Sequence, residues 1–184
     1  KAGMAGGSMN AASLINFLIN KKIFKIKKDK LIKLTKLIGS DVILGIQPKN
    51  TILSSNGKIT KFDKKVKLYT LIVKPNFGCS TKYIYSKVRT FTKQKLNKPK
   101  QSMFKIDFLQ NLDNGLEKIA FNKYPKLRII KSFLLNMPNV VFVRMSGSGS
   151  SVVAYFHSKR ACSYAHRHFN GKFNRLWCIV SKTI

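Results

Sequence analysis

Residues 2–12 read Ala-Gly-Met-Ala-Gly-Gly-Ser-Met-Asn-Ala-Ala, a run of small residues directly before a segment whose apolar residues have helical spacing. Because glycine lacks a Cβ atom, Gly3, Gly6 and Gly7 allow positive φ and a close approach of the backbone to a ligand. The helix that follows offers free N–H groups and the positive end of its dipole. Together these features predict a loop that binds a phosphate group at a helix start.

The chain begins inside this motif, at Lys1 and without a methionine, so we expect it to be the carboxy-terminal part of a longer protein. Its 184 residues are 44% apolar, which is enough for one large domain or two small ones. Only six carboxylates are present, which leaves few candidates for acid–base or metal chemistry. They are Asp29, Asp41, Asp63, Asp107, Asp113 and Glu117.

The formal net charge of +30 raises the question of a nucleic-acid partner, because Lys and Arg release counterions from a phosphate backbone. The lysines are scattered along the whole chain rather than gathered in one tail or stripe. This distribution favours a solvated basic surface that attracts anionic nucleotides. A basic RNA-binding module stays open as an alternative function.

Cys79, Cys162 and Cys178 are odd in number and lack Cys-x-x-Cys spacing, which argues against a disulfide framework or a zinc site. His166 and His168 form a His-x-His pair that we interpret as two surface histidines. No apolar segment approaches the roughly 20 residues of a membrane span. We therefore expect a cytoplasmic protein without membrane association.

Apolar spacing and turn residues predict a mixed α/β (α+β) fold. Ala11, Leu14, Ile15 and Leu18 recur at spacings of three and four, with Gly7 or Ser8 at the helix start. Helices are predicted over residues 8–20, 30–38, 104–122, 125–135 and 159–168, and a further helix opens within 80–89. Strands are predicted over residues 42–46, 51–54, 59–62, 67–74, 140–144, 151–157 and 176–180. Asn56-Gly57 is predicted as a hairpin turn.

Three segments carry candidate chemistry: residues 2–10, the Gly-Ser-Asp of residues 39–41, and a second glycine loop, Ser-Gly-Ser-Gly-Ser, at 146–150. Each alone is ambiguous, because glycine-rich segments are also ordinary turns and a single aspartate after a helix is also a cap. The sequence lacks the P-loop pattern, and its glycine spacing does not fit a dinucleotide-binding motif. The order of the three segments narrows the choice.

In this order the segments resemble those of the GHMP kinases, the family of galacto-, homoserine, mevalonate and phosphomevalonate kinases. The family's phosphate loop is close to Pro-x-x-x-Gly-Leu-Gly-Ser-Ser-x-Ala-Ala, and residues 3–12 match it as Gly-Met-Ala-Gly-Gly-Ser-Met-Asn-Ala-Ala. Residues 145–151 match its late glycine loop. Within the family, residues 2–12, 39–42 and 114–120 are most similar to kinases that act on a cytidine diphosphate sugar alcohol. The resemblance runs from Lys1 to the last predicted strand.

The resemblance implies a GHMP kinase fold, with a ribosomal-protein-S5-like first domain, here partial, and a ferredoxin-like C-terminal domain. We expect residues 1–66 to be the remainder of the N-terminal ATP-binding domain and residues 67–184 to be the C-terminal domain. The family's first domain also supplies a lysine beside the catalytic aspartate, from a segment that this sequence does not contain. We therefore expect the 184 residues alone to be inactive.

The resemblance also implies ATP-dependent phosphorylation of a hydroxyl group, with ATP and Mg²⁺ as cofactors and a cytidine diphosphate sugar alcohol as the small-molecule substrate. Asp41 matches the catalytic aspartate, and Ser8 is the hydroxyl expected nearest the phosphates or Mg²⁺. ATP binding is expected at Lys1, Ala2, Gly3, Met4, Ala5, Gly6, Gly7, Ser8 and Met9. Substrate binding is expected at Tyr85, Gly147, Ser148 and Gly149. No specific nucleic-acid partner is implied, and a monomer or homodimer is expected.

Some residues depart from the family pattern or allow two interpretations. Ala5 replaces a glycine, which narrows the backbone freedom of the loop, and Met9 replaces a serine hydroxyl. Gly115 stands inside a predicted helix, where glycine costs about 1 kcal/mol relative to alanine. Tyr85 matches an aromatic residue that stacks on cytosine, but Tyr83 and Tyr85 could equally pack a helix face. Another alcohol, of the homoserine or mevalonate type, stays open as the substrate.

Overall fold

The computed structural model describes residues 3–39, 41–46, 49–55, 58–63, 65–91 and 95–183. Its first part holds three helices followed by a two-stranded antiparallel sheet. The helices are α1 (Gly6–Asn20), α2 (Lys28–Ile38) and α3 (Val42–Ile46), and the strands are β1 (Asn50–Leu53) and β2 (Ile59–Phe62). A small apolar core forms around Ala12, Ile15 and Val42, so α1 and α3 are held together by buried contacts.

The second part holds a four-stranded antiparallel sheet with the order β4-β5-β3-β6. Its strands are β3 (Tyr69–Lys74), β4 (Val140–Met145), β5 (Val152–Phe156) and β6 (Trp177–Lys182). The helices are α4 (Thr81–Ser86), the 3₁₀ helix η1 (Gln101–Phe104), α5 (Ile106–Gln110), α6 (Glu117–Lys123), α7 (Pro125–Leu135) and α8 (Lys159–Lys172). With α7 between β3 and β4 and α8 between β5 and β6, this topology is ferredoxin-like, as the sequence predicts.

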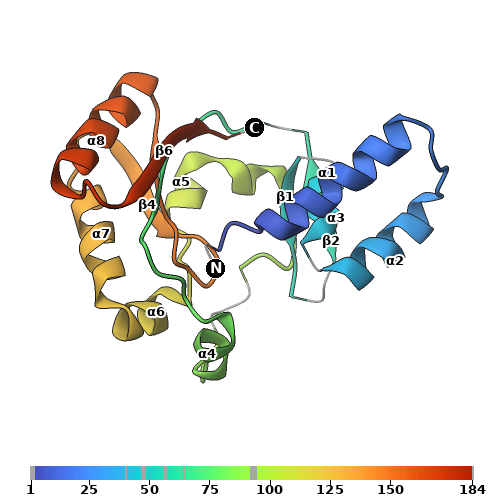
Figure 1. Cartoon of the computed structure of the whole chain (residues 1–184), viewed down its shortest axis with the longest axis horizontal. Helices are drawn as coiled ribbons and strands as arrows, with labels where there is room; N and C mark the ends of the chain where they lie inside the picture. The colour runs from blue at the N-terminus through green and yellow to red at the C-terminus, as the bar shows by residue number, and fades with distance from the viewer. Residues whose placement is uncertain are drawn as a thin grey trace.

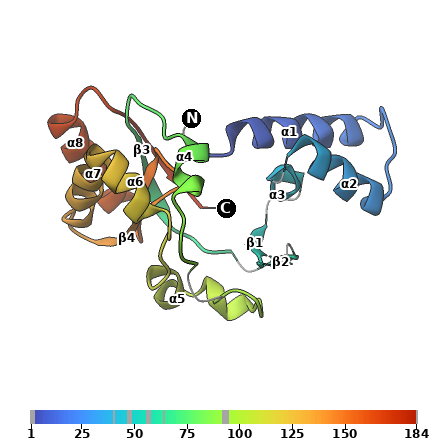
Figure 2. The same cartoon turned by 90° about the horizontal axis from the view of Figure 1, so that it is seen from below.

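The large core lies between the four-stranded sheet and helices α7 and α8, which cover the same face of the sheet (Figure 1). Leu127, Ile130 and Leu134 recur at spacings of three and four on α7, and all three are fully buried. Figure 2 shows this layered part at one end of the molecule and α1, α2 and α3 at the other. The start of α1 points from its own end toward the large sheet.

Residues 42–46 form helix α3, so the predicted strand there is wrong. The β-branched Val42 and Ile43 favour a strand locally, but the packing of this segment against α1 stabilises a helix instead. A Cβ atom on Gly45 would lie 2.7 Å from the Cβ of Ala12, so the two helices approach with almost no side chain between them. The Nδ2 of Asn16 also donates to the carbonyl of Gly45 at 3.3 Å.

The predicted start of the first helix is also corrected. Helix α1 begins at Gly6 rather than Ser8, and Ala5 precedes it with a left-handed φ of 49°. Among the described residues no side chain caps this end, and Gly7 and Ser8, which the sequence places at the helix start, lie within the first turn. The hairpin turn predicted at Asn56-Gly57 lies outside the described residues, although β1 and β2 do pair as antiparallel strands.

A continuous helix over residues 104–122 is likewise wrong, because the segment is divided into η1, α5, an irregular stretch and α6. The side chain of Asn114 donates to the carbonyls of Met145 and Gly147 and accepts the N–H of Leu116. A side chain that satisfies backbone groups in this way competes with helix formation. Gly115 therefore lies outside any helix, and the expected helix penalty does not apply to it.

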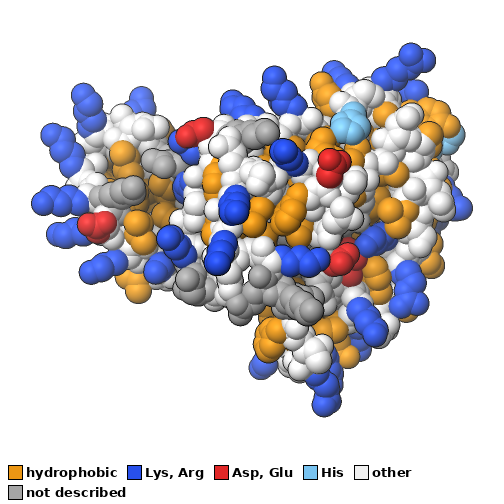
Figure 3. Space-filling view, turned by 180° about the vertical axis from the view of Figure 1, so that it is seen from behind, with side chains coloured by type: hydrophobic (Ala, Val, Ile, Leu, Met, Phe, Trp, Pro, Cys, Tyr) orange, Lys and Arg blue, Asp and Glu red, His pale blue; other side chains and the backbone are white. Residues whose placement is uncertain are grey.

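The division predicted between residues 66 and 67 stays a prediction, although no described strand belongs to both sheets. Within the described part of the chain, no helix is long and apolar enough to cross a membrane. Figure 3 shows Lys and Arg side chains spread across one whole face, with few acidic side chains among them. The positive charge is therefore distributed on this face rather than concentrated in one stripe.

Candidate functional site

The start of α1 is an open helix end that can receive an anion. The first N–H satisfied inside the helix is that of Met9, which donates to the carbonyl of Ala5 at 2.9 Å. The N–H groups of Gly6, Gly7 and Ser8 precede this bond, so helix geometry leaves them without an intrahelical acceptor. A Cβ atom built on Gly6 or Gly7 would meet no atom of the described residues within 4 Å, which leaves space for a ligand beside these amides.

Gly39 lies beside the first turn of α1. A Cβ atom on Gly39 would lie 3.7 Å from Ser8 Oγ, so the serine hydroxyl is next to the end of α2. Asp41 is half-buried and directly precedes α3, and its carbonyl accepts the N–H of Leu44 at 3.1 Å. Because α3 packs along α1, the fold brings the predicted catalytic Asp41 to the same end of α1 as Ser8.

The second glycine loop, residues 146–151, joins β4 to β5. Its ends are tied by the N–H of Ser146, which donates to the carbonyl of Ser151 at 2.9 Å. Gly147 and Gly149 have φ of 53° and 87°, in the region that favours glycine. Ser148, Ser150 and Ser151 are buried, so this loop is packed into the protein rather than extended into solvent.

The two glycine segments meet in space although 143 positions separate Gly3 from Ser146. Ser146 Oγ donates to the carbonyl of Gly3 at 2.7 Å. A Cβ atom on Gly3 would lie 2.4 Å from the Ser146 carbonyl oxygen and 2.6 Å from that of Gly149. Only glycine fits at this contact, so the small residues that open α1 and the second glycine loop form one continuous surface.

Strand register explains why a third segment joins this surface. Met145 pairs with Val152, and Val152 pairs with Val73, so β3 and β4 end at the same edge of the sheet. The residues that follow β3 therefore lie against the second glycine loop. Ser150 Oγ donates to the carbonyl of Phe77 at 2.7 Å, and the hydroxyls of Thr81 and Ser148 are hydrogen-bonded at 3.0 Å.

Cys79 adds an apolar contact to the same surface, because a Cβ atom on Gly149 would lie 2.9 Å from its Sγ. Burial raises the pKa of the Cys79 thiol, so the group stays protonated at neutral pH. It packs the loop as a small neutral side chain rather than acting as a nucleophile.

Tyr83 and Tyr85 both lie on helix α4, but their surroundings differ, which distinguishes the stacking role from the packing role that the sequence leaves open for them. Tyr83 packs against the large core, and the ammonium groups of Lys87 and Lys123 lie 5.6 Å and 5.2 Å from its ring centre. Tyr85 is 58% exposed and lines a hollow of about 440 Å³ together with Phe91 and Gly115. Tyr83 is thus a packing residue, whereas Tyr85 presents its ring to a space that a planar group could enter.

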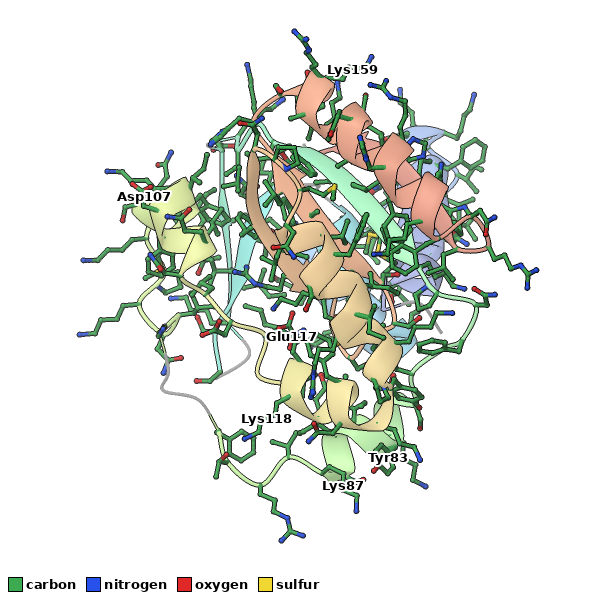
Figure 4. The ribbon with its side chains drawn as sticks, turned by 90° about the vertical axis from the view of Figure 1, so that its left-hand side faces the viewer. Tyr83, Lys87, Asp107, Glu117, Lys118 and Lys159 are labelled. Carbon is green, nitrogen blue, oxygen red and sulfur yellow. The ribbon has the colours of Figure 1, made fainter. Side chains whose placement is uncertain are left out.

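Two residues that the sequence marks only as part of a family element support the second glycine loop from its other side. Asn114 Nδ2 donates to the carbonyls of Met145 and Gly147 at 2.9 Å and 2.8 Å. Glu117 Oε1 accepts the N–H of Met145 at 2.7 Å, and Lys131 Nζ lies 2.5 Å from its Oε2. Figure 4 shows Glu117 at the start of α6 beside the sheet. Both oxygens of Glu117 are thus engaged in contacts that hold the end of β4 in place.

The remaining residues that the sequence predicts to bind ATP differ in how far the structure describes them. Lys1 and Ala2 lie outside the described residues. Met4 is 40% exposed beside the open helix end. The N–H of Met9 is used inside α1, and its sulfur faces Gly45 of α3. Among the described residues, no three His, Cys, Asp or Glu side chains gather as ligands of a metal would.

The arrangement suits phosphate chemistry more than hydrolysis by a nucleophilic side chain. It combines amides without an intrahelical acceptor and a helix dipole at α1, a serine hydroxyl, and Asp41 two positions after the Gly39 that contacts this serine. Amides and dipoles bind phosphate oxygens, and a carboxylate orients an attacking hydroxyl. The described residues thus offer what a phosphoryl transfer needs, which is positioning and neutralisation of charge.

Comparison with known proteins identifies the family. The family model "GHMP kinases C terminal" matches residues 94–170. A 4-diphosphocytidyl-2-C-methyl-D-erythritol kinase of Pelagibacter ubique is 63% identical over all 184 residues, which cover 66% of that relative. The kinase of the same name from Petrotoga mobilis is 33% identical over 158 residues, 82% of this chain and 61% of the relative.

Two solved structures have the same fold. A crystal structure of 4-(cytidine 5′-diphospho)-2C-methyl-D-erythritol kinase aligns with a TM-score of 0.77 at 20% identity, over 99% of this chain and 65% of the other. Homoserine kinase from Cytophaga hutchinsonii aligns with a TM-score of 0.70 at 15% identity, over 100% of this chain and 66% of the other. The predicted GHMP kinase fold is confirmed, and the sequence and structural matches together show that this chain belongs to the GHMP kinase family.

Proposed function

We propose that the protein is an ATP-dependent kinase that phosphorylates the 2-hydroxyl of 4-diphosphocytidyl-2-C-methyl-D-erythritol. The observation that carries the proposal is the contact of Gly3 with Ser146 and Gly149, which joins the open end of α1 to the second glycine loop. The substrate follows from the name of the relative that is 63% identical. Such a reaction belongs to the non-mevalonate route to isoprenoid precursors, as the family resemblance implies.

ATP phosphates are proposed to bind at the start of α1. The N–H groups of Gly6, Gly7 and Ser8 would donate to phosphate oxygens, and the helix dipole would favour their charge. Ser8 Oγ lies beside this end, and Asp41 follows the neighbouring Gly39 by two positions; hydroxyl and carboxylate oxygens are of the type that Mg²⁺ prefers. They would hold the ion together with the phosphates, and Mg²⁺ would neutralise charge on the transferred group.

Asp41 is proposed to orient the attacking hydroxyl and to take its proton. The hydroxyl oxygen forms a bond to the γ-phosphorus, the bond from that phosphorus to the β–γ bridging oxygen breaks, and ADP leaves. A positioned carboxylate that accepts the proton contributes roughly 10²-fold to 10⁴-fold in rate. The support for this role is that Gly39, two positions before Asp41, lies against Ser8, with its Cβ position 3.7 Å from Ser8 Oγ.

The cytidine base is proposed to stack on Tyr85, whose exposed ring lines the hollow beside α4. Stacking of a base on an aromatic ring is worth about 1–3 kcal/mol. Gly147, Ser148 and Gly149 would then contact phosphate groups of the substrate. The hydrogen bond between Thr81 and Ser148 supports this assignment, because it connects α4 to the loop.

Two further assignments belong to the proposal. Cys79, Cys162 and Cys178 are free thiols, which suits a reducing cytoplasm. The active species is proposed to be a monomer or homodimer.

The test is a coupled ADP-release assay on the protein expressed from the complete reading frame that contains these residues. Asp41→Asn is expected to lower kcat at least 100-fold with the cytidine diphosphate substrate, by loss of the proton acceptor. The matched control is Asp63→Asn, because Asp63 is a surface residue paired with Lys49, and it should stay within two-fold of the wild type.

Each contrary result has a separate meaning. A wild-type rate for Asp41→Asn would contradict the role of Asp41. ADP release with homoserine but not with the cytidine diphosphate substrate would contradict the substrate assignment and would support a homoserine kinase, the activity named for the second structural neighbour.

A further inference from the structure

The second glycine loop is held from outside the predicted site by the irregular segment between α5 and α6. We propose that Asn114 is a positioning residue that turns the Gly147 carbonyl of this loop away from bound phosphate and so leaves the N–H of Ser148 to face the ligand. The inference rests on the proposed function, because it assigns a phosphate group to the loop. It adds a residue to which the sequence assigns no role.

Asn114 uses its whole amide group in this contact. Its two Nδ2 hydrogens go to the carbonyls of Met145 and Gly147, at 2.9 Å and 2.8 Å. Its Oδ1 accepts the N–H of Leu116 at 3.0 Å, which fixes the amide plane. An asparagine amide has two donors, so one is committed to the last carbonyl of β4 and the other to a carbonyl of the loop.

The position of a carbonyl decides where the next N–H points. In a trans peptide the C=O and the following N–H lie in one plane and point in opposite directions. The Gly147 carbonyl faces Asn114, so the N–H of Ser148 points away from Asn114. Backbone N–H groups attract an anion, whereas a carbonyl oxygen carries partial negative charge and repels it.

A second residue of the same segment completes the support. Glu117 Oε1 accepts the N–H of Met145 at 2.7 Å, so the N–H and C=O of Met145 are both bound by the 114–117 segment. Lys131 Nζ lies 2.5 Å from Glu117 Oε2 and holds the carboxylate in place. The loop therefore leaves β4 with its orientation set by contacts that lie outside the glycine segments.

On its opposite side the loop is held by its own serine hydroxyl groups, and its own carbonyl groups take no part in these bonds. Ser146 Oγ donates to Gly3, Ser150 Oγ donates to Phe77, and Ser148 Oγ bonds with Thr81. These contacts locate the loop against its neighbours, but none of them engages the peptide that joins Gly147 to Ser148. Asn114 supplies the restraint on that peptide, which is why a change there should act on ligand binding.

The test compares Asn114→Ala with Asn111→Ala in the complete protein. Asn111 lies three positions earlier and donates locally to the Asp107 carbonyl at 2.7 Å, so it loses the same amide without touching the loop. We expect Asn114→Ala to raise the KM of a phosphate-bearing substrate at least ten-fold while kcat changes less than three-fold. Asn111→Ala should leave both constants within two-fold of the wild type.

The split between KM and kcat separates positioning from stability. A merely structural loss would reduce the folded fraction, which lowers apparent kcat and leaves KM unchanged. Varying ATP and the cytidine diphosphate substrate in turn shows which phosphate faces the loop, and a rise in either KM supports the inference. If Asn114→Ala fails to fold, Asn114→Ser, which keeps one hydroxyl donor, should show a smaller rise in the same KM.

Calorimetric titration with ATP and with CDP keeps this inference separate from the proposed function. If the wild type releases no ADP with any alcohol, the kinase assignment fails, but weaker binding of ATP or CDP to the Asn114 variants still supports the loop role. Wild-type KM values and wild-type affinity for both nucleotides in Asn114→Ala, or in a folded Asn114→Ser, would overturn it.

Discussion

The pair formed by Lys131 and Glu117 offers a sharp test of the packing behind the second glycine loop. Its atoms lie 2.5 Å apart, and the side chains are only 23% and 13% exposed. Glu117 also accepts the N–H of Met145, whereas no other hydrogen bond of the Lys131 ammonium is seen among the described residues. Lys131→Met should therefore leave a largely buried carboxylate with one remaining donor.

The magnitude follows from burial. Removing one partner of a fully buried pair costs about 3–5 kcal/mol, whereas an exposed pair is worth about 0.2–1 kcal/mol. The Lys131–Glu117 pair lies between these limits but nearer the buried one, so we expect Lys131→Met to lower the free energy of unfolding by about 2–3 kcal/mol. Glu117→Gln should cost less, about 1–2 kcal/mol, because the amide oxygen still accepts the Met145 N–H and the long lysine chain can reach water.

Urea unfolding followed by far-UV circular dichroism measures both variants. Lys49→Met is the matched control, because Lys49 and Asp63 lie 2.6 Å apart with side chains 46% and 86% exposed, and its effect should stay below about 0.5 kcal/mol. A result for Lys131→Met within about 0.5 kcal/mol of the wild type would refute the reasoning, since a close partly buried pair would then behave like a surface pair.

Three further predictions address packing and titration. Gly3→Ala should lower kcat/KM at least ten-fold because its Cβ would lie 2.4 Å from a carbonyl oxygen, and equal steady-state rates for wild type and variant would contradict this. Gly45→Ala should destabilise the fold by about 1–3 kcal/mol in urea, because overpacking against Ala12 outweighs the gain in helix propensity, and a more stable variant would show that the helices can part. Burial raises the pKa of Cys162 to about 11 from 9.0, so its contribution to stability is complete below pH 9 and is lost as the pH rises through about 11. Between about pH 9 and pH 11 this thiol should make the free energy of unfolding fall by about 1.4 kcal/mol per pH unit. Cys162→Ala should lack this fall. If the free energy of unfolding of Cys162→Ala falls as steeply as that of the wild type, the thiol is excluded as its source.

Segments with a strong local pattern were predictable from the sequence. Pro125–Leu135 has proline in its first turn and an apolar face, and the structure has helix α7 at those residues. Strands β4, β5 and β6 also follow their apolar runs to within a few residues. The family's loop motifs predicted which segments carry chemistry, and the fold brings Gly3 against Ser146 and Gly149, and Gly39 against Ser8.

Segments decided by distant contacts were not predictable in this way. Residues 42–46 look like a strand, and their helix depends on how closely Gly45 meets Ala12. The break in the predicted helix over 104–122 depends on Asn114, whose partners lie about 30 positions away in the chain. Periodicity reports a residue's neighbours in sequence, so it could not reveal partners that only the ferredoxin-like strand order brings near.

The glycines of the first motif show most clearly what a local pattern leaves undetermined. Gly3, Gly6 and Gly7 are interpreted from the sequence as one phosphate loop, with the same reason for each glycine. In the structure a Cβ atom on Gly3 would strike two carbonyl oxygens, whereas a Cβ atom on Gly6 or Gly7 would meet nothing. The protein itself therefore requires glycine at position 3. At positions 6 and 7 an alanine would fit the empty helix end, so any requirement for glycine there must come from a ligand.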